Sequence, residues 1–190
     1  MKRVLIFGDA HIPSRRDSIP DSFHKTIEET DYDLALVTGD LVSENDMRAA
    51  LPPLPECYIV QGNMDYGGTH DFHRIIPIDN LSILLIHGTQ LRPRGSIKQL
   101  REIVDNVGAD IAIHGHTHKP AIDLYSERLF LNPGTISGAT GGWSGRLDAS
   151  FMEADVSESK VEVRLHVTNW KVAKVSQMRF CKEDTVMKQC

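Results

Sequence analysis

Val4-Leu5-Ile6-Phe7-Gly8-Asp9-Ala10-His11 is a short apolar run that leads, within a few residues, to two side chains able to bind a metal. Runs this short and this rich in Val, Ile and Leu predict fully buried strands of a sheet that is covered on both faces. In open sheets of this kind, ligands bind beyond the carboxyl ends of the strands. Four further runs follow the same plan: residues 34–37 lead to Asp40, 58–60 to Asn63, 83–86 to His87, and 111–113 to His116 and His118. We therefore expect the five strand ends to meet at one edge and to form a multinuclear metal site.

Length and composition are those of an ordinary globular protein. The 190 residues predict a single domain, which we place at residues 1–180, followed by a flexible tail at residues 181–190. The net charge of −5 argues against binding to duplex nucleic acid or to an anionic membrane, although a small phosphorylated substrate is compatible with it. The N-terminal apolar stretch is too short for a signal peptide, and no run approaches the roughly 18 residues of a membrane span. We therefore expect a cytoplasmic protein.

The three cysteines are odd in number and widely spaced, at Cys57, Cys181 and Cys190. No Cys-x-x-Cys pair is present, so the sequence contains neither a recognisable disulfide framework nor a thiolate metal clip. We expect three free thiols.

The first half of the chain alternates strand and helix, and the second half is mostly strand. Apolar spacing predicts helices near residues 19–27 and 44–51, and a third helix whose capping box is Ser96 with Gln99 and whose C-terminal cap is Gly108. After residue 113, strands are expected at residues 121–125, 128–131, 150–156 and 161–167, with a last one within 170–180. This order predicts two packed sheets with helices on their outer faces.

The polar motifs at the strand ends resemble a known family. Asp-x-His, Gly-Asp, Gly-Asn-x-Asp, a lone His and Gly-His-x-His occur in that order at residues 9–11, 39–40, 62–65, 87 and 115–118. Together they resemble the calcineurin-like metallophosphoesterase superfamily, and the small size and Asn132-Pro133-Gly134 are similar to its compact bacterial and archaeal phosphodiesterase branch. The resemblance implies an α/β fold, a four-layer αββα sandwich of two mixed β-sheets flanked by helices. It also implies that the Asn132-Pro133-Gly134 turn supports the site.

The resemblance further implies two divalent ions and a set of residues that hold them. The first ion would be bound by Asp9, His11, Asp40 and His118, and the second by Asp40, Asn63, His87 and His116, so that Asp40 bridges the pair. A hydroxide between the ions would attack a small phosphodiester. Asp40, Asn63 and Asp65 are the expected catalytic residues, and Asn63 and Arg15 the expected substrate-binding residues. His114 departs from the motif, and we expect it to be a structural residue or one that supports a metal ligand. Imidazole, carboxylate and amide ligands without a thiolate favour Mn²⁺, with Ni²⁺, Zn²⁺ or Fe²⁺ as alternatives.

One position departs from the family pattern. Many members have a histidine where this chain has Met64, and that histidine helps to protonate the leaving group or to bind phosphate. A thioether cannot donate a proton, and loss of a general acid typically costs about 10²–10⁴-fold in rate. We therefore expect slow turnover and a preference for diesters with good leaving groups.

Two other interpretations stand beside the enzyme. A single Asp after a strand is more often a helix cap or a turn former than a metal ligand. Ile12-Pro13 and Arg15 also resemble the retromer subunit of the vacuolar protein sorting pathway, an interaction protein with the same fold and an altered metal site. A scaffold with a vestigial or structural metal site is therefore the alternative function, and a homodimer is a further option that the compact branch suggests.

Overall fold

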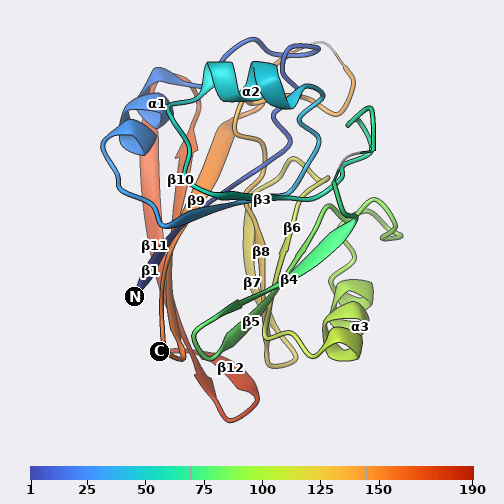
Figure 1. Cartoon of the computed structure of the whole chain (residues 1–190), viewed down its shortest axis with the longest axis vertical. Helices are drawn as coiled ribbons and strands as arrows, with labels where there is room; N and C mark the ends of the chain where they lie inside the picture. The colour runs from blue at the N-terminus through green and yellow to red at the C-terminus, as the bar shows by residue number, and fades with distance from the viewer. Residues whose placement is uncertain (69, 144) are drawn as a thin grey trace.

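The described residues form two β-sheets. The computed structural model describes residues 1–68, 70–143 and 145–190 (Figure 1). Seven strands form the larger sheet: β1 (Lys2–Phe7), β2 (Leu34–Val37), β3 (Cys57–Ile59), β9 (Ala149–Ser157), β10 (Lys160–Thr168), β11 (Ala173–Glu183) and β12 (Val186–Gln189). Five strands form the smaller sheet: β4 (His73–Ile78), β5 (Leu81–Ile86), β6 (Ile111–His114), β7 (Ala121–Tyr125) and β8 (Arg128–Asn132).

Strand order explains how the two sheets bring their polar ends together. The larger sheet runs β12-β11-β10-β9-β1-β2-β3 and the smaller one β4-β5-β6-β8-β7. The neighbours β1, β2 and β3 are parallel, and so are β5, β6 and β8, whereas the remaining pairs are antiparallel. Both sheets are therefore mixed, and the strands that lead to the predicted metal ligands form two parallel blocks.

Alternation along the strands produces a four-layer arrangement. In β1, Val4 and Ile6 belong to the apolar core between the two sheets, whereas Leu5 and Phe7 belong to a second core beneath α1 (Asp21–Glu28) and α2 (Glu44–Ala50). A third core lies between the smaller sheet and α3 (Ile97–Val107) (Figure 1). Two sheets between outer helices confirm the predicted αββα sandwich.

The helix ends largely follow the sequence signals. Ser96 accepts a hydrogen bond from the Gln99 backbone N–H (3.4 Å), and Gly108 ends α3 in the left-handed conformation at φ +67°. The second half of the expected capping box is absent, because the Gln99 side chain bonds the backbone N–H and carbonyl of Arg92 instead. Among the described residues, no helix has the length and apolar character needed to cross a bilayer.

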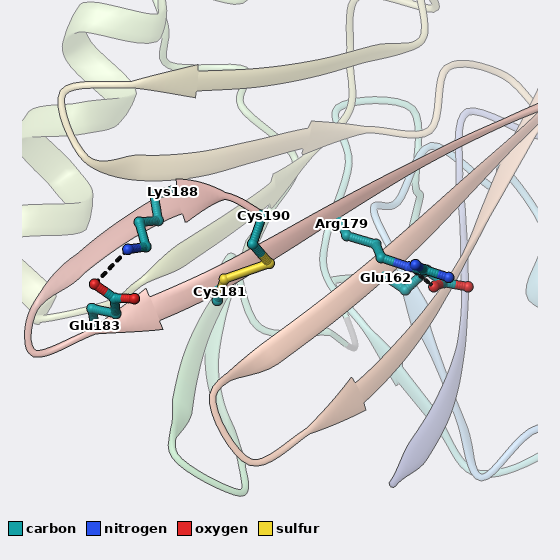
Figure 2. Close-up of a disulfide and its surroundings, with 6 residues drawn as sticks. All are labelled: Glu162, Arg179, Cys181, Glu183, Lys188 and Cys190. Atoms are coloured by element: carbon teal, nitrogen blue, oxygen red, sulfur yellow. Dashed lines mark hydrogen bonds and ion pairs between the residues drawn. A yellow bond between two sulfur atoms is a disulfide. The ribbon is translucent and has the colours of Figure 1, made fainter.

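The C-terminal residues differ from the expectation. Residues 181–190 do not form a flexible tail: β11 continues to Glu183 and β12 pairs antiparallel with it, so that Met187 is buried in the core between the sheets. The prediction of three free thiols is wrong, because Cys181 and Cys190 form a disulfide across this hairpin with their Cα atoms 6.1 Å apart (Figure 2). The hairpin places the two cysteines at disulfide distance, which their spacing in the sequence does not reveal. Cys57 is free.

Candidate metal centre

The predicted ligands gather at the carboxyl ends of the two parallel blocks. Asp9 and His11 follow β1, Asp40 follows β2 and Asn63 follows β3, while His87 follows β5, and His116 and His118 follow β6. Six of these side chains are buried and Asn63 is exposed. The structure therefore brings all seven residues to one place, with the amide of Asn63 at its open side.

The first group of donor atoms comes from Asp9, His11, Asp40 and His118, whose ligand atoms lie within 4.8 Å of one another. His11 Nε2 lies 3.2 Å from His118 Nε2 and 3.5 Å from Asp40 Oδ2. His118 Nε2 lies 3.5 Å from Asp9 Oδ1. These four residues are the predicted first set.

The second group comes from Asp40, His87 and His116, with Asn63 beside it. His87 Nε2 lies 3.5 Å from Asp40 Oδ2, 3.1 Å from His116 Nδ1 and 3.2 Å from Asn63 Oδ1. Asp40 Oδ2 is thus equally close to one histidine of each group. The other carboxylate oxygen, Oδ1, accepts the Met64 backbone N–H (2.7 Å), whereas Oδ2 faces one histidine of each group.

The spacing and the unmet bonding capacity of these atoms fit metal ions. Ligands about 2.1 Å from a metal lie roughly 3.0 Å apart at right angles and roughly 3.4 Å apart at tetrahedral angles. Asp9 Oδ1 is buried and accepts no hydrogen bond from the residues that the structure describes. A buried carboxylate oxygen without a partner is destabilising. A cation bound between these atoms would satisfy it.

Two ligand histidines are held in the tautomer that binding requires. His87 Nδ1 donates to the Thr38 carbonyl and His118 Nδ1 to the Ala139 carbonyl, each at 2.7 Å. A carbonyl oxygen only accepts hydrogen bonds, so the proton sits on Nδ1 and the Nε2 lone pair faces the site. The sequence offers no sign of either partner, because both are backbone carbonyls.

Burial also sets the charge state of the site. It lowers the pKa of His11 to about 3, with the nearby Arg15 guanidinium adding to the effect, and lowers the pKa of His116 to about 4. It raises the pKa of Asp9 and of Asp40, and for Asp9 the neighbouring Asp40 carboxylate is the next cause. With these pKa values the imidazoles of His11 and His116 are neutral at pH 7, so they offer lone pairs but no positive charge to the two buried carboxylates. Divalent ions would supply that charge.

The backbone at the ligands is strained. Five candidate ligands have φ between +47° and +68°, a region that residues other than glycine rarely adopt: Asp9, His11, Asp40, His116 and His118. Clusters of such residues are typical of functional sites. Glycines allow the turns to approach each other: a Cβ on Gly115 would lie 2.9 Å from Asp9 Oδ2, and one on Gly62 would overlap the backbone of Asp40.

Asp65 supports the site through the backbone. The carboxylate of Asp65 accepts four backbone N–H groups. Oδ1 accepts those of Leu41 (2.6 Å) and Val42 (2.9 Å), and Oδ2 accepts those of Asp40 (2.9 Å) and Gly62 (2.8 Å). Asp65 therefore ties the turn after β2 to the turn after β3, and so fixes Asp40 relative to Asn63.

The Asn132-Pro133-Gly134 turn supports the histidine segment, as the family resemblance implied. Asn132 Nδ2 donates to the Gly115 carbonyl (3.2 Å) and to Thr117 Oγ1 (3.0 Å), and lies 3.2 Å from His114 Nδ1. Asn132 Oδ1 accepts the Gly134 N–H. His114 is buried beside this network, away from the two donor groups that contain His116 and His118.

Arg15 lies at the edge of the first donor group. Its Nη1 donates to the Thr140 carbonyl (2.7 Å) and lies 3.4 Å from His11 Nε2. Two further arginines bind backbone nearby: Arg16 donates to the Gly138 carbonyl, and Arg94 Nη1 donates to the His116 carbonyl (3.4 Å).

Comparisons with known proteins agree with this geometry. The calcineurin-like phosphoesterase superfamily domain matches residues 1–159. A probable metallophosphoesterase of Methanothermobacter thermautotrophicus is 39% identical over 134 residues, which cover 70% of this chain and 76% of that protein.

Solved structures of similar proteins cover almost the whole chain. Wild-type Vps29 from Entamoeba histolytica, crystallised in complex with Zn²⁺, has a TM-score of 0.82 and 28% identity and covers 93% of this chain and 98% of its own. Vacuolar Protein Sorting 29 from Cryptosporidium parvum has a TM-score of 0.85 and 26% identity. It covers 95% of this chain and 98% of its own.

Proposed function

The chain belongs to the calcineurin-like phosphoesterase superfamily, and from this premise we propose that it is a phosphodiesterase that depends on two divalent metal ions. The observation that carries the proposal is the pair of buried donor groups that share Asp40 Oδ2, together with the unsatisfied Asp9 Oδ1. Donors that are nitrogen and oxygen only fit Mn²⁺, Fe²⁺, Zn²⁺ or Ni²⁺, and Mn²⁺ is our first choice among them. The Zn²⁺ complex of Entamoeba histolytica Vps29 supports metal binding in a protein of this fold.

Each residue has a role in this proposal. When bound, two ions lower the pKa of water and neutralise charge on phosphate oxygens. Asp9, His11, Asp40 and His118 would hold one ion, and Asp40, Asn63, His87 and His116 the other. The exposed Asn63 amide and the Arg15 guanidinium stand beside the two groups and would orient the phosphate oxygens by donating hydrogen bonds. Asp65 would keep Asp40 in place through the backbone N–H groups it binds.

Met64 shapes the expected substrate preference. Its backbone N–H binds Asp40, but its side chain has no proton to give to a leaving group. We therefore propose that the preferred substrates are small phosphodiesters whose leaving groups depart without protonation. The homodimer and the cytoplasmic location stay predictions.

An interaction scaffold is the second candidate. The likeness to Vps29 favours it, because this chain and Vps29 share one fold over almost their entire lengths. Retention of a full set of buried donor atoms favours the enzyme. Hydrolysis assays together with affinity capture of partners would separate the two, because a scaffold would bind a stable protein partner and hydrolyse nothing.

Two ligand variants test the proposal. Asp40→Ala removes the shared oxygen and His118→Ala removes one donor of the first group. Each should lower kcat/KM for bis-p-nitrophenyl phosphate by at least about 100-fold. Loss of a residue that only supports a metal ligand already costs about 10–100-fold in metal affinity or activity. His24→Ala, which lies on α1 outside the site, should behave as wild type. Turnover retained in both ligand variants, with the fold intact by circular dichroism, would contradict the proposal.

A further inference from the structure

A pocket of about 540 Å³ opens beside the second donor group. Asn63 and His87 line it, so the pocket and the donor group share two side chains. A phosphate held at that group would stand at the mouth of the pocket. Binding pockets for small molecules typically measure 300–1,000 Å³, so there is room for a substituent far larger than the phosphate itself.

An exposed aromatic side chain forms part of the pocket wall. Phe72 lines the pocket and is 77% exposed, while Ile86 contributes a buried apolar surface. The segment before β4 is fixed to the end of β3, because the Gln61 N–H donates to the Asp71 carbonyl (2.8 Å) and Val60 bridges to Asp71. Phe72 is therefore presented on a backbone that is tied to the ligand loop, rather than on a free segment.

A positioned cation completes the pocket. Arg92 lines it, and its Nη1 donates to the carbonyls of Thr89 (2.6 Å) and Leu91 (2.9 Å). The Gln99 side chain holds the backbone of Arg92 from both sides, at 2.7 Å to its N–H and 2.6 Å to its carbonyl. Within residues 1–68, 70–143 and 145–190, no carboxylate lies within 4.0 Å of the Arg92 guanidinium. Its charge is available to a ligand.

From these contacts we propose that the pocket binds one ester group of the phosphodiester, and that this group carries a planar aromatic ring of the nucleobase kind. The inference rests on the proposed phosphodiesterase function and narrows its substrate class. A ring stacked on Phe72 would cover apolar surface that now faces water, and Arg92 would bind the polar edge of the same group. Aromatic stacking accepts any base, because each has a π-face. The pocket would therefore select for an aromatic ring without distinguishing one base from another.

Two substrates with the same leaving group test the proposal. Thymidine 5′-(p-nitrophenyl) phosphate and methyl p-nitrophenyl phosphate differ only in the ester group that would enter the pocket. In the Mn²⁺-loaded protein, kcat/KM should be higher for the thymidine ester. Phe72→Ala should lower the ratio of the two kcat/KM values about tenfold, as loss of a base-stacking side chain typically does, and Phe72→Trp should keep it.

Tyr66→Ala is the matched control. Tyr66 is also 77% exposed and lies in the same connection between β3 and β4, but it does not line this pocket. Its removal should leave the ratio at the wild-type value. An equal effect of Phe72→Ala on both esters, or no effect on either, would overturn the proposal; the second result is the one expected if Phe72 serves to dock a protein.

A binding measurement separates this inference from the proposed function. Thymidine 5′-monophosphate should bind the Mn²⁺-loaded protein more tightly than methyl phosphate does, and Phe72→Ala should remove the difference. Turnover of both esters without any dependence on Phe72 would reject the pocket alone. Binding that depends on Phe72, with neither ester hydrolysed, would reject the phosphodiesterase and retain the aromatic site.

Discussion

At the scale of single residues, Asp65 links the candidate metal site to the backbone around it. Its two carboxylate oxygens accept four N–H groups from the turns that present Asp40 and Asn63. Asp65→Asn replaces one acceptor oxygen by an N–H₂ group that faces donors. We expect Mn²⁺ affinity to fall about 10–100-fold, with kcat largely restored at saturating Mn²⁺.

Titration of activity against Mn²⁺ concentration checks this expectation. Asp71→Asn is the control, because Asp71 lies in the same connection but pairs with the exposed Arg74. An unchanged Mn²⁺ midpoint in the Asp65 variant would show that the turns hold their positions without it.

Met64 provides a second test at this scale. Met64→His would place a proton donor where the chain has a thioether, and general acids typically contribute about 10²–10⁴-fold. The rate should rise most for poor leaving groups, so a plot of log kcat/KM against leaving-group pKa should become shallower. Met64→Leu should keep the wild-type slope. An unchanged slope in the histidine variant would show that slow turnover does not result from the missing general acid.

Residue types and their order were sufficient to predict which side chains gather at the strand ends, because each candidate follows an apolar run and strand ends converge. The backbone partners of the histidines were not predictable. The partners of His87 and His118 are the carbonyls of Thr38 and Ala139, and a carbonyl is present at every position. The role of Asp65 also depends on turns that only the folded chain defines.

At the scale of elements, the β9–β10 pair carries a buried carboxylate with several donors. Glu153 Oε1 accepts from Tyr32 (2.7 Å), and Oε2 accepts from Arg164 (3.0 Å) and contacts His166 Nε2 (2.8 Å). Burial alone would raise the pKa of Glu153, but the hydrogen bonds from these three side chains outweigh it and lower the pKa from 4.5 to about 2. These hydrogen bonds to Glu153 therefore stabilise the fold only while its carboxylate is ionised.

The sign of the pH dependence follows. Because the folded-state pKa is depressed, the contribution is fully present above pH 4.5 and is lost as the pH falls through about 2. After a discount for solvent screening, we expect wild type to lose about 2 kcal/mol more unfolding free energy between pH 5 and pH 2 than Glu153→Gln does. Urea unfolding at both pH values measures this. Glu102→Gln, at an exposed position on α3, should follow wild type, and parallel losses in wild type and Glu153→Gln would refute the assignment.

Elements differ in how well sequence patterns define them. The 3.6-residue spacing and the caps located α3 to within a residue. The C-terminal hairpin was missed because β12 has only four residues and gains its stability from pairing with β11 and from burial of Met187. Neither contribution is visible in a short, mostly polar segment.

At the scale of the whole molecule, three apolar cores between the layers hold the two sheets and their helices together. The layers were predictable from strands flanked by amphipathic helices. Strand order was not, because the pairing of β1 with β9 joins segments far apart in the chain and depends on register rather than local pattern. This pairing matters for function, since β1 carries Asp9 and His11 to the edge where both sheets end.

Hydrolysis of bis-p-nitrophenyl phosphate by metal-stripped protein tests the central claim most directly. The account predicts no turnover without metal, and turnover on addition of Mn²⁺ that reaches its maximum at two ions per chain. Equal turnover without metal would contradict it. So would the absence of turnover with Mn²⁺, Ni²⁺, Co²⁺ and Zn²⁺ alike, a result that would favour a scaffold whose ligands serve the structure.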